Sequence, residues 1–147
     1  MTVKSSTGLR NAMLATSSFR ALFHGASQLR IYAGPIPANA DAATTGATLL
    51  VTIRKDDTDP LGFETTPADG VLQKAAAETW EGTVAASGTA AFFRLVLTAD
   101  DDAASTTAPR LQGTVGLAGA DLVMTSTALV ATALQSFNNA AFTLPPG

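Results

Sequence analysis

The sequence contains no cysteine and few charged side chains. Without cysteine the chain can form neither disulfides nor thiolate zinc sites, and this composition fits synthesis in a reducing cytoplasm. Charged residues make up 14% of the 147 residues, whereas globular chains average about 25%. Because so few charges leave little polar side chain for the surface, we expect small residues or other proteins to cover much of it.

Clustered cations and long apolar runs are also missing. The nine Lys and Arg residues are scattered singly and the net charge is −3. Binding to nucleic acid through phosphates requires clustered cations, so we expect no direct nucleic-acid partner.

The first residues lack an apolar stretch of signal-peptide length, and Arg94 interrupts the apolar residues 90–97. A membrane helix needs about 20 apolar residues, so we expect a soluble protein without a membrane partner, made inside the cell.

Alternation of apolar and polar residues predicts a mainly β fold. In residues 28–33, Leu29 and Ile31 face one way while Arg30 and Tyr32 face the other, as in a half-buried strand. Residues 90–98 are apolar on both faces, which is typical of a central strand. Such short strands, separated by turns, indicate one antiparallel β-sandwich of the jelly-roll or immunoglobulin-like type. The other predicted strands cover residues 47–54, 80–85, 110–115, 122–127 and 136–144, with a short hairpin of residues 62–65 and 71–74. Residues 128–133 are predicted as a further strand or a short bend.

A short helical arm is predicted before the strands. Apolar residues at helical spacing indicate helix over residues 6–24, with a break and a second N-cap at Ser17 and Ser18 and a stop at Gly25. We therefore divide the chain into a helical N-terminal arm, residues 1–27, and a β-sandwich domain, residues 28–147. A small β-body cannot bury every apolar side chain of such an arm, which favours docking to a partner. The candidate assembly interface is Leu9, Arg10, Met13, Leu14, Phe19, Leu22 and Phe23.

Residues suited to catalysis are few. His24 is the only histidine, and its predicted place at a helix end favours capping of carbonyl groups or a surface position over general-base chemistry. Glu64, Glu78 and Glu81 could supply the paired carboxylates of a glycoside hydrolase, but nothing in the sequence fixes their separation. We therefore predict a protein that is not an enzyme, without catalytic or cofactor-binding residues.

Two acidic clusters raise the question of calcium. Asp56, Asp57 and Asp59 form the first cluster, and residues 100–102 form the second. Calcium binds clustered carboxylates on flexible loops, but neither cluster has the glycine and distal glutamate of an EF-hand loop. We interpret both clusters as solvated surface turns and predict no metal site.

Several segments resemble one family of proteins. They are STGLRNAML (6–14), IYAGPIPANADAA (31–43), GATLL (46–50), ETWEG (78–82), SGTAAFFR (87–94), QGTVG (112–116) and GADL (119–122). In these segments the chain resembles a family of small proteins encoded among the structural genes of tailed bacteriophages and prophages, and SGTAAFFR is the most specific of them. The resemblance implies a virion protein made in the bacterial cytoplasm, and it brings no catalytic residues.

Four functions remain open on these grounds. The first is a head decoration or cement protein bound to the major capsid protein. The second is a neck, tail or fibre-attachment protein arranged in a ring against portal or tail proteins. The third is a carbohydrate- or receptor-binding β-module, and the fourth is a small hydrolase acting on the cell envelope. We favour the decoration protein and expect it to form a homo-oligomer, because many copies make weak contacts collectively strong.

Overall fold

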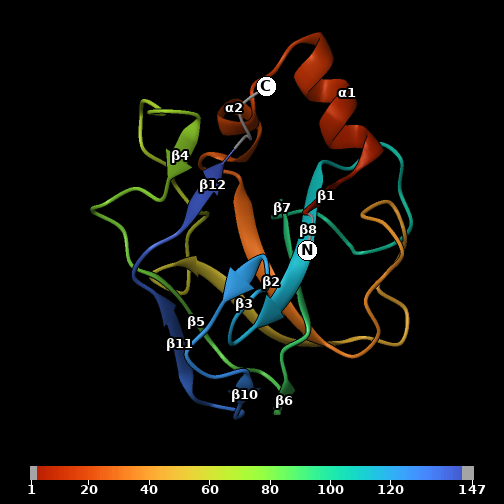
Figure 1. The fold of residues 1–147 in the computed structure, drawn as a ribbon, viewed down its shortest axis with the longest axis vertical. Coiled ribbons are helices and arrows are strands. Elements are labelled where there is room, and N and C mark those ends of the chain that lie inside the picture. Colours follow the sequence, from red (N-terminus) through yellow and green to blue (C-terminus); the bar gives the residue numbers. More distant parts are fainter. Residues whose placement is uncertain (1–2, 144–147) are drawn as a thin grey trace.

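The computed structural model describes residues 3–143, and over these residues the fold is mainly β, as predicted. Figure 1 shows both helices at one end of the molecule and the short strands β6 and β10 at the opposite end. The helices are α1 (Thr7–Ala15) and α2 (Phe19–Phe23). The strands are β1 (Lys4–Ser5), β2 (Ser27–Ala33), β3 (Thr48–Lys55), β4 (Val71–Gln73), β5 (Trp80–Thr83), β6 (Gly88–Thr89), β7 (Phe92–Leu97), β8 (Arg110–Gly116), β9 (Leu122–Val123), β10 (Ala128–Leu129), β11 (Leu134–Phe137) and β12 (Ala141–Thr143).

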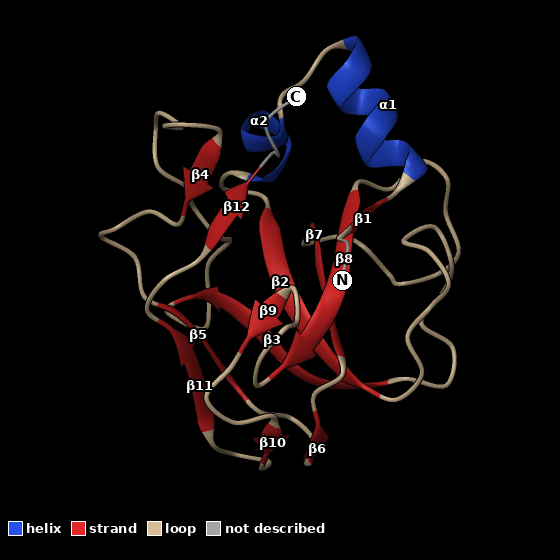
Figure 2. Cartoon of the chain, in the orientation of Figure 1, coloured by secondary structure: helices blue, strands red, loops and turns tan. Residues whose placement is uncertain are grey.

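One large sheet organises the described residues. Its strand order is β1-β8-β7-β2-β3-β5-β11, and neighbours on this path are antiparallel. Strand β9 pairs with β8 in parallel, while β6 with β10 and β4 with β12 form two separate two-stranded sheets. Figure 2 shows that long loops connect these strands on both sides of the sheet. The arrangement is consistent with the predicted sandwich, and its jelly-roll or immunoglobulin-like type stays a prediction.

The two faces of the sheet differ in chemistry. In the register of β2 with β7, Ile31 lies opposite Phe93, whereas Arg30 lies opposite Arg94. Because successive side chains of a strand alternate between faces, apolar residues gather on one face and arginines on the other. The predicted alternation in residues 28–33 is therefore confirmed, but the strand is not half-buried as predicted, because Gln28 and Tyr32 on its polar face are buried as well. Strand β7 is central, as predicted, and its first five residues are all buried.

The apolar face carries the main core. The core includes Trp80 and Phe63, whose rings meet edge to face at a centroid distance of 5.4 Å. Leu9 of α1 and Phe23 of α2 belong to the same core, and β1 pairs with β8. The first 27 residues are thus joined to the β-body by both packing and backbone hydrogen bonds. The division into an arm of residues 1–27 and a domain of residues 28–147 stays a prediction.

The C-terminal third is less regular than predicted. In place of a strand over residues 122–127, the structure has β9 of two residues, and residues 128–133 form β10, also of two residues, followed by a turn, which agrees with the predicted strand or short bend. Residues 136–144 form no single strand, because the chain leaves β11 after Phe137 and begins β12 at Ala141; residue 144 lies outside the described residues. Small Ala, Ser and Thr side chains dominate this stretch, and they bury too little apolar area to hold long strands against the core.

The predicted hairpin of residues 62–65 and 71–74 is present only in part. Single bridges join Phe63 to Lys74 and Ala68 to Val71, but the strand partner of β4 is β12. Asp69 and Gly70 form the tight turn, with φ angles of 52° and 77°. Asp and Gly tolerate this left-handed region better than most residues.

Candidate assembly interface

A buried serine fixes the beginning of α1. The hydroxyl of Ser6 accepts hydrogen bonds from the backbone N–H groups of Leu9 (3.0 Å) and Arg110 (2.9 Å) and donates one to the carbonyl of Ala108 (2.8 Å). A Cβ atom added to Gly8 would lie 2.3 Å from the carbonyl oxygen of Thr107. The first turn of α1 is thus tightly held against β8 and the loop before it.

The second helix begins at the predicted break. Ser18 has an extended backbone, and its hydroxyl accepts the N–H of Ala21 at 3.1 Å, as an N-cap does. Gly25 follows the helix with a φ of 69°, a left-handed conformation that suits glycine. The ring of Phe19 lies 4.7 Å from that of Phe23 and 5.4 Å from that of Phe142, measured between centroids. Aromatic packing therefore ties α2 to β12.

The structure separates the seven predicted interface residues by their exposure. Leu9 and Phe23 are buried in the main core and present almost no surface to a partner. Leu14 is the most open large apolar residue of the described chain, with 86% of its surface exposed. Arg10 is exposed, and the remaining three residues, Met13, Phe19 and Leu22, are half-buried.

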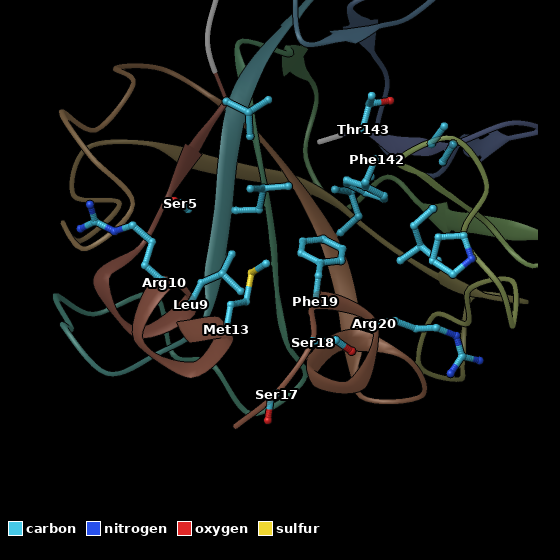
Figure 3. A pocket seen from close by; sticks show the side chains of 18 of the residues that line it. Ser5, Leu9, Arg10, Met13, Ser17, Ser18, Phe19, Arg20, Phe142 and Thr143 are labelled. Carbon is cyan, nitrogen blue, oxygen red and sulfur yellow. The ribbon is translucent and has the colours of Figure 1, made fainter. Parts of the chain in front are cut away.

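An open apolar cavity of about 1580 Å³ lies between the two helices and the sheet. We call it the helical groove and define it by Met13, Leu14, Phe19, Leu111, Phe137 and Phe142. Figure 3 shows Met13 and Phe19 pointing into it from the two helices, with Phe142 facing them from β12. The deeper wall contains Trp80 and Phe93.

Sequence reasoning missed the part of the groove that comes from the sheet. Leu111, Phe137 and Phe142 lie far from the helices in sequence, and each is half-buried. Their alternation with polar residues indicated strands, but not which surface those strands would share with α1 and α2. That information comes from tertiary packing.

Two arginines flank the helical groove. Figure 3 shows Arg10 and Arg20 on its two sides, with both side chains directed outward. The Nε of Arg20 donates to the carbonyl of Glu64 at 2.7 Å, and Nη2 of Arg10 donates to the Thr7 hydroxyl at 3.0 Å. Carbonyl and hydroxyl oxygens leave the charge of a guanidinium in place, so each flank of the groove carries a cationic side chain. On the Arg10 flank, the carboxylate of Asp41 lies close enough to interact with this charge.

Asp41 reinforces the start of α1 from a loop. It accepts hydrogen bonds from the hydroxyl (2.6 Å) and the backbone N–H (2.7 Å) of Thr7. The hydroxyl hydrogen bond is the main reason why the pKa of Asp41 lies below its usual value. A carboxylate at this position also interacts favourably with the helix dipole.

The opposite face of the sheet holds a buried polar network. Arg94 is fully buried, and its guanidinium donates to the Gln112 side chain at 2.9 Å and to the carbonyl of Ala42 at 2.7 Å. Burial, together with the nearby charge of Arg110, lowers the pKa of Arg94. Because its bonds run to residues of the 34–47 loop, Arg94 holds that loop on the sheet.

Two ion pairs complete this network. Arg110 binds Asp100 with an Nε–Oδ2 distance of 2.7 Å, and Arg30 binds Asp102 with an Nη1–Oδ2 distance of 2.7 Å. Burial raises the pKa of Asp100, but hydrogen bonds from Arg110 and from the backbone of Asp102 outweigh it, so its pKa lies below the usual value. Burial and the hydrogen bond to Asp102 raise the pKa of Tyr32.

The interpretation of residues 100–102 as a solvated turn was therefore wrong for two of the three carboxylates. The side chain of Asp100 is 2% exposed and that of Asp102 is 17% exposed. Arginines from two different strands, Arg30 of β2 and Arg110 of β8, supply the compensating charge, which a search for calcium motifs in one segment could not detect. Asp101 is exposed, as predicted.

The other candidate residues have local structural partners. Glu78 accepts hydrogen bonds from the backbone of Gly62 (2.8 Å) and the Trp80 indole (3.0 Å), and Glu64 accepts one from the backbone of Ala76 (2.6 Å). His24 lies at the end of α2 and is exposed, as predicted; its backbone N–H donates to the carbonyl of Arg20, and its Nδ1 accepts the N–H of Phe63 at 2.9 Å.

The acidic turn of residues 56–59 is likewise locally bonded. Asp57 accepts hydrogen bonds from the Thr83 hydroxyl at 2.8 Å and from the Thr83 backbone at 3.2 Å. Within residues 3–143, no three acidic, histidine or cysteine side chains gather in a way that could hold a metal ion. Nor does that part of the chain contain a helix long and apolar enough to span a membrane.

No family model, curated protein or solved structure matches the chain.

Proposed function

We propose that this protein is a non-enzymatic structural component of a tailed-phage particle, and specifically a head decoration or cement protein bound to the major capsid protein. The observation that carries the proposal is the helical groove, an open apolar surface assembled from both helices and from β8, β11 and β12. Open apolar surface of this kind marks contact sites for other molecules. The resemblance of the sequence to phage structural proteins supports the same conclusion.

The rest of the surface suits repeated protein contacts. Leu117, Val123, Val130 and Leu134 are 56–63% exposed, and all four lie in the irregular C-terminal third. A contact made through a few exposed apolar side chains is weak by itself, but many copies of the chain on one particle make such contacts collectively strong. This is the physical basis for proposing a homo-oligomer or a lattice-bound array.

A rigid body favours such a role. The network of Arg30, Arg94 and Arg110 fastens the loops of residues 34–47 and 98–109 to one face of the sheet. A surface that is already ordered loses less conformational entropy on binding, and more of its contact energy therefore appears as affinity.

A ring protein of the neck, tail or fibre attachment is the second candidate. Strand β11 forms an edge of the large sheet in the described chain, and Leu134 on it is 60% exposed. An edge strand can pair with a strand of a neighbouring subunit, and such head-to-tail contacts close into rings.

The copy number of the chain in purified particles tests both candidates. Quantitative mass spectrometry against the major capsid protein gives this number. A ratio of about one to one, or one to a few, is the result expected for lattice decoration, whereas about six or twelve copies per particle is expected for a ring. Absence from the particles would contradict both.

A further inference from the structure

Within residues 3–143, no segment fills the helical groove. Helix α1 has nine residues, and isolated helices shorter than about 12–15 residues are marginal in water. Packing must therefore stabilise it, yet its buried residues, Gly8 and Leu9, both lie in its first turn. Met13 and Leu14, in its second half, border the open groove. An occupant of the groove would supply the missing contacts.

The charges around the groove indicate the chemistry of this occupant. Residues 1–40 contain four Lys and Arg residues and no Asp or Glu, although the whole chain contains twelve acidic residues. Asp121 is the acidic residue of the lining; the backbone N–H and hydroxyl of Thr114 hold its carboxylate in place, and it keeps its charge. The lining therefore carries two guanidinium groups against one carboxylate, and this excess of positive charge favours an occupant with a carboxylate.

A second copy of this chain is a poor occupant. A two-fold interface would place the same surface on both sides and bring Arg10 and Arg20 close to their own copies. Like charges in an interface cost free energy. In a head-to-tail contact, the acidic turn at residues 56–59 could pair with the arginines, but it contains no large apolar side chain that would fill the cavity.

A membrane surface also fits poorly. Segments that bind bilayers present apolar side chains outward on a convex face. Here Met13 and Phe19 point into a hollow between two helices, where acyl chains of a flat bilayer would not reach. A polypeptide segment with protruding side chains matches the concave shape.

We infer that the helical groove binds a segment of a different protein, one that presents large apolar side chains and at least one carboxylate positioned to pair with Arg10 or Arg20. The inference rests on the proposed function, because the particle would supply that neighbouring protein. The apolar side chains would cover Met13 and Leu14, and the carboxylate would orient the segment between the two arginines.

Two synthetic peptides test this inference on the isolated full chain. Both are helical peptides of about 14 residues with leucines at positions i, i+3, i+4 and i+7; one carries glutamates beside this face and the other carries lysines. Trp80, the single tryptophan, lines the groove, so its fluorescence reports occupation. We expect the glutamate peptide to bind at least about tenfold more tightly than the lysine peptide.

Three variants sharpen the result. Arg10→Glu should reverse the preference between the peptides, because Arg10 is exposed and its described side-chain bond is to Thr7 alone. Leu14→Asp should weaken binding of the glutamate peptide at least about tenfold, and Leu134→Asp, a matched change at an exposed leucine outside the groove lining, should not. Circular dichroism confirms that each variant is folded.

Equal binding of the two peptides, preference for lysine or no binding of either would overturn the inference. So would dimerisation that Leu14→Asp abolishes, or Leu14-dependent binding to vesicles of anionic phospholipid. Selective binding of the glutamate peptide by a chain that is absent from particles would refute the proposed function alone and leave the chemistry of the groove standing.

Discussion

Buried charges are the most unusual residues of this chain. Arg94 and Arg110 are fully buried although arginine is rarely so, and Asp100 balances one of them. Among the described residues, Nη1 of Arg94 and Oδ1 of Asp102 are buried without a hydrogen-bond partner. Removal of one member of a buried ion pair leaves the other charge buried without compensation. The free-energy cost of that unpaired charge exceeds the stabilisation that the intact pair provides.

Asp100→Asn should therefore destabilise the protein by about 3 kcal/mol at neutral pH. The pKa of Asp100 is lower in the folded chain than the value of about 3.9 expected in the unfolded chain. A carboxyl of this kind adds stability that is fully present above the unfolded pKa and is lost as the pH falls through the folded pKa. Urea unfolding between pH 2 and pH 7 should show a smaller loss of stability on acidification in the variant than in the parent.

Asp101→Asn is the matched control, because Asp101 is exposed and accepts a hydrogen bond only from the nearby backbone of Ala103. We expect its unfolding free energy to follow that of the parent across the same range. A variant at position 100 with the parent's stability at every pH would show that the ion pair with Arg110 contributes nothing.

Phe93 tests the apolar face of the sheet. It is 4% exposed, belongs to the main core and lies on the deep wall of the helical groove. Phe93→Ala should lower the free energy of unfolding by about 3–5 kcal/mol, because it removes buried apolar surface and leaves a cavity. Chemical denaturation measures this loss, and a change near zero would instead place Phe93 on an exposed face.

At the scale of elements, local signals predicted the chain well where local chemistry decides the structure. Ser18 and Gly25 mark the ends of α2 because a hydroxyl cap and a left-handed glycine are requirements of the helix itself. The alternation in β2 was equally visible. Strand pairing was not, since the partnership of β4 with β12 joins residues about 70 positions apart.

The two caps provide a prediction at this scale. Ser18 is exposed and its hydroxyl caps only α2, so Ser18→Ala should cost about 1 kcal/mol. Ser6 is buried, and its hydroxyl also accepts the N–H of Arg110 and donates to Ala108. Ser6→Ala should cost at least 1 kcal/mol more, because it leaves buried backbone groups without partners. Thermal unfolding of both variants gives the comparison, and equal losses would contradict the role of Ser6 in joining α1 to β8.

At the scale of the whole molecule, the sequence was enough to predict the mainly β fold class. It was not enough to predict which side chains of the helices complete the core and which stay exposed. The alternation of apolar and polar side chains in residues 28–33 indicated a strand from the local sequence alone. The arm, in contrast, was predicted from the apolar spacing of residues 6–24 alone. That spacing cannot distinguish a side chain that meets a partner, such as exposed Leu14, from one that completes the core, such as Leu9. Only the position of the helices on the sheet makes this distinction.

Deletion of residues 1–24 decides whether the arm is separable. A separate arm would leave a folded β-body that merely fails to join the particle. The structure leads us to expect loss of cooperative folding instead, because the deletion removes Leu9 and Phe23 from the core and β1 from the sheet. Each buried side chain contributes about 1.5–3 kcal/mol, a large share of the 5–15 kcal/mol by which domains are typically stable.

Circular dichroism and urea unfolding of the truncated chain measure this outcome, with Leu14→Asp in the full chain as the control that changes the groove but not the core. The Leu14→Asp variant should retain the parent's urea unfolding midpoint, because Leu14 is 86% exposed. It should lose only its affinity for the partner. If the truncated chain instead unfolds cooperatively at the parent's midpoint, the helices are an appendage, and the core contacts of Leu9 and Phe23 contribute little to stability. If it does not fold, the same two helices both complete the core and present the groove, so that assembly and folding depend on one element.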